Sequence, residues 1–196
     1  MDSDQVVFAG VEISSGRKPV TLAVMDRELN VIQIEQCAVT DAISLLSEQE
    51  SVQLVINTPG TKSGADIHSD FKRKLKPASF TQFSRGEGAR TWNDASAQDC
   101  YRAFRPELFP KRTLEGRIQR ALILYEEGIR MHDPMDFFEE ITRHKLLQGL
   151  LPDEIIYSIK QLDALIAAYV SWLVVNRPHR VVARGDLIVP KNTEDG

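Results

Sequence analysis

Cysteine, histidine and long apolar runs are all scarce in this sequence. Its 196 residues include two cysteines and four histidines. Cys37 and Cys100 do not have the spacing of a metal-ligand motif, so we expect reduced thiols, with a single disulfide as the alternative. No apolar run is long enough to span a bilayer, and the acidic start MDSDQ lacks the basic region of a signal peptide. We therefore expect a cytoplasmic protein with no membrane partner.

The residues that are abundant are those of a globular protein. Hydrophobic residues make up 42% of the sequence and charged residues 27%, which is the balance of an ordinary soluble domain. A chain of 196 residues is long enough to bury a substantial core within one domain. We therefore predict a single domain over residues 1–196.

The net charge of −4 hides an uneven distribution of charge along the chain. Residues 62–120 carry 13 Lys and Arg against 7 Asp and Glu, whereas the rest of the chain carries 11 against 21. A basic segment in an otherwise acidic protein indicates a surface for an anionic ligand, nucleic acid included. The alternative is that these side chains only solvate a helical, loop-rich segment.

The first 60 residues carry the strongest strand signals. Apolar runs predict three strands, over residues 5–14, 19–26 and 28–37. Because their links are short, these strands should form an antiparallel meander. A short amphipathic helix follows, and then the apolar run SVQLVIN, which is typical of a buried parallel strand. We expect residues 6–14 to form a central strand between the second strand and residues 54–57.

The later part of the chain contains helices and one long aperiodic segment. Residues 61–112 show little periodicity, so we predict an irregular basic insertion there. Further elements are predicted as a helix from residue 114, a strand over residues 136–141, an apolar helix over residues 158–176 and short strands within residues 180–190. This order is that of an α/β ribonuclease H-like domain, in which a mixed sheet carries helices on both faces.

Two carboxylates stand in apolar surroundings. Glu12 lies in the first predicted strand, and Asp163 lies in the most apolar helix. Buried acids are rare unless they are paired or bound to a cation. In a ribonuclease H-like arrangement these positions converge, and clustered carboxylates favour Mg²⁺ or Mn²⁺. The simpler alternatives are that Glu12 is the solvated residue of an edge strand and that Asp163 caps its helix or faces solvent.

Six segments, spread over nearly the whole chain outside parts of residues 61–112, have the spacing of one known family. They are GVEIS, VINTP, TLEGRIQRALILYEEG, FFEEITRHKLLQG, LDALIAAYVSWL and GDLIVP. Together they resemble the domain of unknown function 429 family of predicted ribonuclease H-like nucleases. The resemblance implies catalytic positions at Glu12, Asn57, Glu140 and Asp163, with Glu12, Glu140 and Asp163 as metal ligands. The family pattern has Asp where this chain has Glu12 and Asn57, and the neutral Asn57 weakens cation binding.

The leading prediction is a metal-dependent nuclease or a related phosphotransfer enzyme, with Mg²⁺ or Mn²⁺ as cofactor and nucleic acid as partner. The basic segment would supply phosphate contacts and a stacking surface through Lys72, Arg73, Lys74, Arg85, Arg90 and Trp92. The alternative is a non-catalytic binding or scaffold module with a degraded site, which Asn57 favours. An actin-like nucleotide-handling protein is a weaker hypothesis, because GTKSG lacks the spacing of a P-loop. A homodimer is one of the oligomeric states that the sequence allows.

Overall fold

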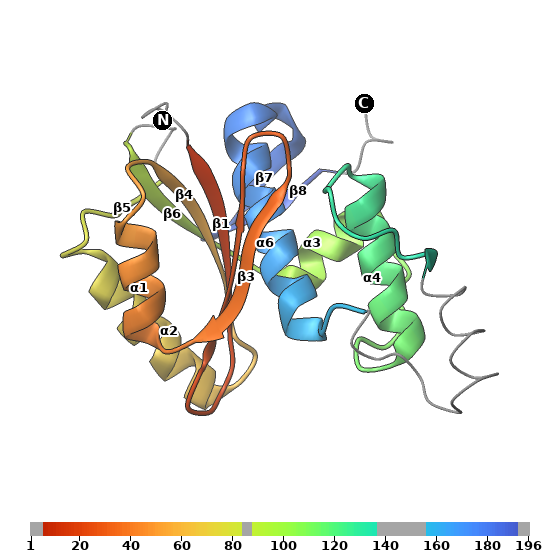
Figure 1. Cartoon of the computed structure of the whole chain (residues 1–196), viewed down its shortest axis with the longest axis horizontal. Coiled ribbons are helices and arrows are strands. Elements are labelled where there is room, and N and C mark those ends of the chain that lie inside the picture. Colours follow the sequence, from red (N-terminus) through yellow and green to blue (C-terminus); the bar gives the residue numbers. More distant parts are fainter. Residues whose placement is uncertain (1–5, 84–87, 137–155, 192–196) are drawn as a thin grey trace.

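The computed structural model of the chain describes residues 6–83, 88–136 and 156–191. Its strands are β1 (Val7–Ile13), β2 (Val20–Met25), β3 (Val31–Cys37), β4 (Val52–Asn57), β5 (Thr81–Gln82), β6 (Arg90–Ala95), β7 (Val181–Arg184) and β8 (Leu187–Pro190). Its helices are α1 (Val39–Ser47), α2 (Lys62–Leu75), α3 (Ala97–Phe104), α4 (Leu114–Glu126), α6 (Ile159–Asn176) and the short 3₁₀ helix η2 (Pro178–Arg180). Figure 1 shows the sheet between two helical layers, with α1 and α2 on one face and α3, α4 and α6 on the other.

The strands form one mixed sheet in the order β3-β2-β1-β4-β6-β8-β7, with β5 paired to β6. The first three strands are antiparallel neighbours, whereas β1, β4 and β6 run parallel. The predicted central strand is therefore confirmed, because β1 lies between β2 and β4. The prediction of an α/β protein with a mixed sheet is confirmed as well. A cluster of buried apolar side chains fills the space on each face of the sheet.

Residues 61–112 are not the irregular insertion that the sequence predicts. They contain α2, α3 and the sheet strand β6, which pairs in parallel with β4. The sequence of β6, RTWNDA, carries no apolar run by which a strand could be recognised. The strand buries Asp94, and the carboxylate of Asp94 is paired with His68 and Lys72 of α2. A contact between distant residues thus stabilises a strand that local pattern does not indicate.

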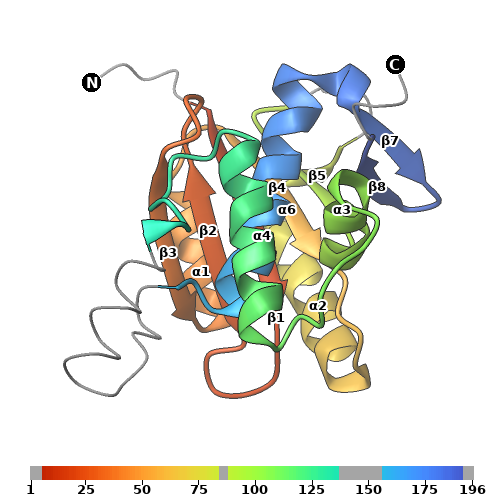
Figure 2. The same ribbon diagram turned by 90° about the vertical axis from the view of Figure 1, so that its right-hand side faces the viewer.

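Helix α6 packs on β1 at very short range because the strand has no side chain at the crossing point. A Cβ built on Gly10 would lie 2.0 Å from the backbone oxygen of Ala164 and 2.2 Å from the backbone nitrogen of Ala168. Figure 2 shows α6 between the sheet and α4, and α6 contacts both. The close approach holds Asp163, the residue before Ala164, against the carboxyl end of β1.

Of the other predictions, those for the helices and the cysteines are confirmed, and the one for the fifth strand is not tested. The predicted helices near residues 40–49, 114–131 and 158–176 are confirmed as α1, α4 and α6. Residues 137–141 of the predicted fifth strand lie outside the described residues. Cys37 and Cys100 are free, buried thiols, as expected. No helix in the described part of the chain combines the length and hydropathy that a bilayer crossing requires.

Candidate functional site

Three polar residues from distant parts of the chain meet on the α6 face of the sheet. Glu12 lies near the end of β1, Asn57 is the last residue of β4, and Asp163 lies in the second turn of α6. The Nδ2 atom of Asn57 donates a hydrogen bond of 2.6 Å to the backbone oxygen of Asp163, and the side chain of Asn57 also lowers the pKa of the Glu12 carboxyl. The carboxyl ends of parallel strands are where open α/β sheets bind ligands. We therefore take this cluster, called the acid site below, as the candidate functional site.

The structure excludes the simpler explanations for the two acids. Glu12 lies on an interior strand of the sheet and not on an edge. Asp163 is 5% exposed, and the cap of α6 is Ser158, whose side chain accepts a hydrogen bond from the backbone of Gln161. Asn57 is 2% exposed, whereas Glu12 is partly exposed. The acid site is thus largely buried and reaches solvent on the side of Glu12.

Burial dominates the electrostatics of the acid site. Burial and, to a smaller extent, the nearby charge of Asp163 raise the pKa of Glu12, against the lowering effects of Asn57, Lys111 and Lys160, and the net pKa is about 8. Burial likewise raises the pKa of Asp163 to about 6, against the lowering effects of Lys111 and Arg120. The metal-free acid site therefore holds a proton near neutral pH.

These raised pKa values predict that the metal-free protein loses stability as the pH rises. The folded chain binds protons more tightly than the unfolded chain, so the free energy of unfolding should fall between about pH 4 and about pH 8. The Glu12→Gln variant removes the carboxyl group that has the larger of the two pKa shifts. Its melting temperature at pH 8 should exceed that of the wild type by about 5 °C or more, since 1 kcal/mol corresponds to about 2–4 °C in a domain of this size.

The check is a series of thermal melts in a chelating buffer at pH 4, 6 and 8. The difference between the two proteins should shrink toward pH 4, where both acids are protonated in the wild type. Glu50→Gln, at an exposed position, is the control and should leave the pH profile unchanged. A wild-type melting temperature that is flat across this range would contradict the placement of Glu12.

The acid site offers oxygen ligands that fit a hard divalent cation. The Oδ1 atom of Asn57 is buried and has no hydrogen-bond partner among the described residues, which is a rare condition for a buried polar atom. Together with the carboxylates of Glu12 and Asp163, this oxygen completes a set of the kind that Mg²⁺ or Mn²⁺ prefers. The described residues contain no group of three or more His, Cys, Asp or Glu that could hold a metal. The predicted third acid, Glu140, lies outside the described residues.

Most of the cations predicted to contact phosphates are engaged away from the acid site. The Nζ atom of Lys72 lies 2.6 Å from Asp94 on the α2 face of the sheet. Lys74 and Arg73 both pair with Asp70 on α2. The guanidinium of Arg90 donates hydrogen bonds to the backbone oxygens of Ser47, Gln49 and Ala78. The partners of Lys72, Arg73, Lys74 and Arg90 thus lie outside the acid site.

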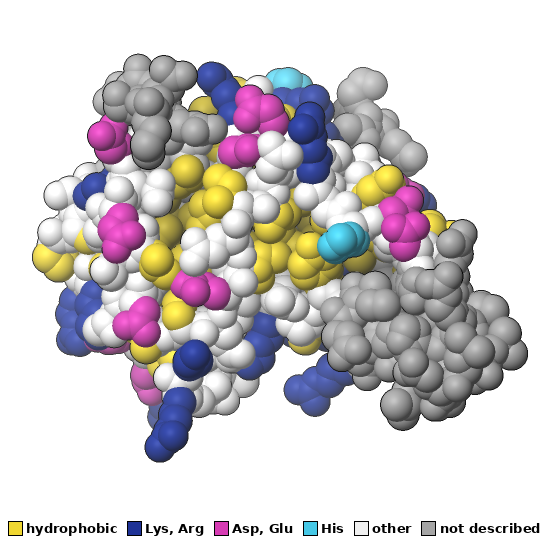
Figure 3. Space-filling view, viewed as in Figure 1, with side chains coloured by type: hydrophobic (Ala, Val, Ile, Leu, Met, Phe, Trp, Pro, Cys, Tyr) yellow, Lys and Arg dark blue, Asp and Glu magenta, His cyan; other side chains and the backbone are white. Residues whose placement is uncertain are grey.

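The two other predicted nucleic-acid contacts are Trp92, which the structure places, and Arg85, which it does not describe. Trp92 is 7% exposed and packs in the core between the sheet and α2, with the ammonium of Lys72 over its ring at 4.3 Å. Its ring is therefore a core group and not a stacking surface for bases. Arg85 lies outside the described residues. On the face seen in Figure 3, the Lys and Arg side chains are scattered around the margin and form no single patch.

Lys111, one of the cations of the basic segment, does reach the acid site. The Nζ atom of Lys111 lies 3.9 Å from the Oδ2 atom of Asp163. The buried guanidinium of Arg120 is a second positive charge that acts on Asp163. In the sequence, Lys111 is marked by its position beside Arg112, directly before Thr113, the N-cap of α4. Nothing in that local pattern indicates contact with residue 163.

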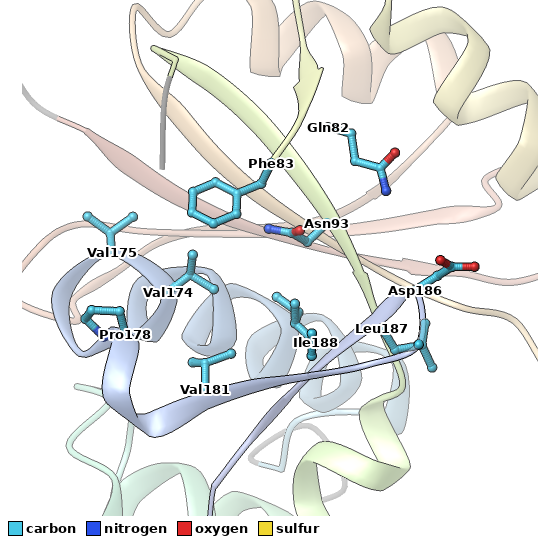
Figure 4. Close-up of a pocket in the computed structure, with 12 residues that line it drawn as sticks. Gln82, Phe83, Asn93, Val174, Val175, Pro178, Val181, Asp186, Leu187 and Ile188 are labelled. Atoms are coloured by element: carbon cyan, nitrogen blue, oxygen red, sulfur yellow. The ribbon is translucent and has the colours of Figure 1, made fainter. Parts of the chain in front are cut away.

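A separate hollow of about 660 Å³ lies at the far end of α6. Figure 4 shows Phe83 and Asn93 on one side of it and Val174, Val181 and Ile188 on the other. Its lining is mainly apolar and includes one acid, Asp186, and no Lys or Arg. A hollow of this composition could hold an apolar group but lacks the paired acids of the acid site.

Comparison with known proteins adds no family assignment. Neither a scan against protein-family models nor a search of the curated proteins finds a match to this chain. A shared architecture does not by itself define a function. The function is therefore inferred from the chemistry of the acid site.

Proposed function

We propose that this chain is a ribonuclease H-like protein of the domain of unknown function 429 family whose acid site binds a divalent cation and hydrolyses a nucleic-acid phosphodiester. One observation carries the proposal. Glu12, Asp163 and the unpartnered Oδ1 atom of Asn57 converge at the carboxyl ends of two parallel strands. Two acids whose pKa values are raised by burial need a counter-charge when both ionise, and a divalent cation would supply it.

The topology of the sheet supports the proposal. Three antiparallel strands lead into parallel strands on one side of β1, and a late helix lies across β1. That helix carries Asp163 to the strand that carries Glu12. The proposed family places acids at both positions, so the sequence resemblance and the geometry lead to the same residues.

Each residue of the acid site has a distinct proposed part. A bound Mg²⁺ or Mn²⁺ supplies Lewis-acid activation of water and of the phosphate. Glu12 and Asp163 would hold the ion, and Glu12 would give up its proton when the ion binds. Asn57 would orient the site, because its amide donates a hydrogen bond to the backbone oxygen of Asp163 and also lowers the pKa of the Glu12 carboxyl. Partial burial limits the access of water, which strengthens the electrostatic interactions within the site.

A non-catalytic binding module is the second candidate function, and two observations favour it. Asn57 supplies a neutral amide at a position where the family pattern has Asp. The ammonium of Lys111 also lies near Asp163 already. Under this hypothesis the protein would bind nucleic acid but would not cleave it. The same experiments separate the two functions, because only the enzyme needs the divalent ion for turnover.

The proposed function is tested first by binding and cleavage. Mn²⁺ at millimolar concentration should raise the melting temperature of the wild type by several degrees, because it binds only the folded chain. A fluorescent single-stranded oligonucleotide should be cleaved in the presence of Mn²⁺ and left intact in a chelator. Metal-induced stabilisation without cleavage of DNA or RNA would favour the binding module, and the absence of both would contradict the proposed function.

Nucleic-acid binding should weaken with salt to a moderate degree. Among the described residues, the cations near the acid site that reach solvent are Lys111 and Lys160, which act on Glu12, and the adjacent Arg112. Three phosphate contacts to a single strand predict a slope of about −2 for log K against log salt concentration, at about 0.7 per contact. Fluorescence anisotropy titrations at salt concentrations between about 50 and 200 mM measure this slope. Salt-insensitive binding would argue against phosphate contacts.

A further inference from the structure

The loop between α3 and α4 is fastened to α4 by side-chain hydrogen bonds. Figure 2 shows this loop running from α3 to the start of α4. The backbone nitrogen of Phe109 donates to the Oε1 atom of Gln119 at 2.8 Å, and the Nε2 atom of Gln119 donates to the backbone oxygen of Glu107 at 2.9 Å. The hydroxyl of Thr113 donates to the backbone oxygen of Pro110 at 2.9 Å. The residues on both sides of Lys111 are therefore held in place.

A close contact and a buried charge add to this fastening. A Cβ built on Gly116 would lie 2.1 Å from the backbone oxygen of Pro110, so the loop packs directly on the first turn of α4. The guanidinium of Arg120 is 3% exposed and donates hydrogen bonds to the backbone oxygens of Phe109 and Gly116. It also lies 5.4 Å from the ring of Tyr101. The loop thus rests on a buried cation next to the acid site.

This fastened loop presents one of its two adjacent cations to a buried acid. The Nζ atom of Lys111 lies 3.9 Å from the Oδ2 atom of Asp163, although 53% of the Lys111 side chain is exposed. Arg112, the next residue, is exposed and has no ion pair to the acid site. An exposed lysine can move away from its partner at little cost, because its side chain is long and its ammonium is readily hydrated. Lys111 therefore combines a fixed backbone with a mobile charge.

We propose that Lys111 is the resident counter-ion of Asp163, that a divalent cation displaces it, and that the released ammonium then contacts the substrate phosphate. This inference rests on the proposed cation site. The exchange is one of ions alone, in which Asp163 gives up an ammonium and gains a metal ion. The displaced charge stays beside the acid site because the backbone of the loop is fixed. Removal of Lys111 should then strengthen metal binding and weaken substrate binding.

The test measures Mn²⁺ affinity by isothermal titration calorimetry on the full chain. The Lys111→Gln variant should bind Mn²⁺ about fivefold more tightly than the wild type, because a competing cation is gone. Arg112→Gln makes the same change of charge one residue away and should stay within about twofold of the wild type. Lys111→Arg keeps the charge and should keep an affinity close to that of the wild type. With Mn²⁺ at saturation, Lys111→Gln should bind a non-cleaved phosphorothioate oligonucleotide about threefold more weakly.

The outcomes separate this inference from the proposed function. If Lys111→Gln binds Mn²⁺ no more tightly than Arg112→Gln, the displacement of Lys111 is wrong while the cation site stands. If its metal affinity rises but its oligonucleotide affinity equals that of the wild type, the contact with phosphate is wrong. If no variant binds Mn²⁺, both the cation site and the inference are wrong.

Discussion

The Asp163→Asn variant is expected to lose divalent-cation binding and phosphodiester hydrolysis while keeping its fold. Asp163 is one of two carboxylates in the described acid site, so its replacement halves the negative charge available to a cation. Hydrolysis should fall on the order of a hundredfold or more, the usual consequence of removing one preorganised charged group from an active site. The metal-free variant should melt at the same temperature as the wild type at pH 8 or a few degrees above it, because a buried, repelled charge is gone.

Melting curves with and without Mn²⁺, together with an oligonucleotide cleavage assay, check this expectation. Asp66→Asn is a suitable control, because Asp66 is exposed on α2 on the opposite face of the sheet. A structural role for Asp163 would give the reverse pattern, in which the melting temperature falls and metal affinity is unchanged. Equal stabilisation of variant and wild type by Mn²⁺ would show that Asp163 is not a ligand.

The Gly10→Ala variant is expected to destabilise the fold strongly. The added Cβ would lie 2.0 Å from the backbone oxygen of Ala164 and 2.2 Å from the backbone nitrogen of Ala168. Neither atom can rotate away, because both belong to the helix backbone, so α6 must lift from β1. We expect a loss of about 3 kcal/mol or more, the upper range for overpacking of a core. That loss corresponds to a fall in melting temperature of roughly 10 °C.

A lifted α6 should also weaken the acid site, since Asp163 precedes Ala164. The Mn²⁺ affinity of Gly10→Ala, measured below its melting temperature, should therefore be lower than that of the wild type. Gly60→Ala is the matched control, because a Cβ at Gly60 has nothing within 4 Å. It should leave both stability and metal affinity unchanged. A melting temperature of Gly10→Ala close to that of the wild type would contradict the close packing of α6 on β1.

Strong apolar periodicity allowed several elements to be predicted from the sequence alone. The meander of β1, β2 and β3, the parallel strand β4 and the helices α1, α4 and α6 all follow from local patterns of apolar residues. The two acids were recognisable for the same reason. A charge within a uniformly apolar segment contrasts with its neighbours, and that contrast singles out Glu12 and Asp163 without any knowledge of their contacts.

Other features depend on contacts between residues far apart in the chain, and only the tertiary structure decided them. Strand β6 is a polar sequence whose Asp94 is satisfied by His68 and Lys72 from α2. Lys111 reaches Asp163 because the loop before α4 is fastened by contacts that reach forward into that helix. The burial of Trp92 likewise depends on the packing of α2 against the sheet. Local pattern reports which residues prefer the interior, whereas the neighbours of a charged or polar side chain are set by the way the whole chain packs.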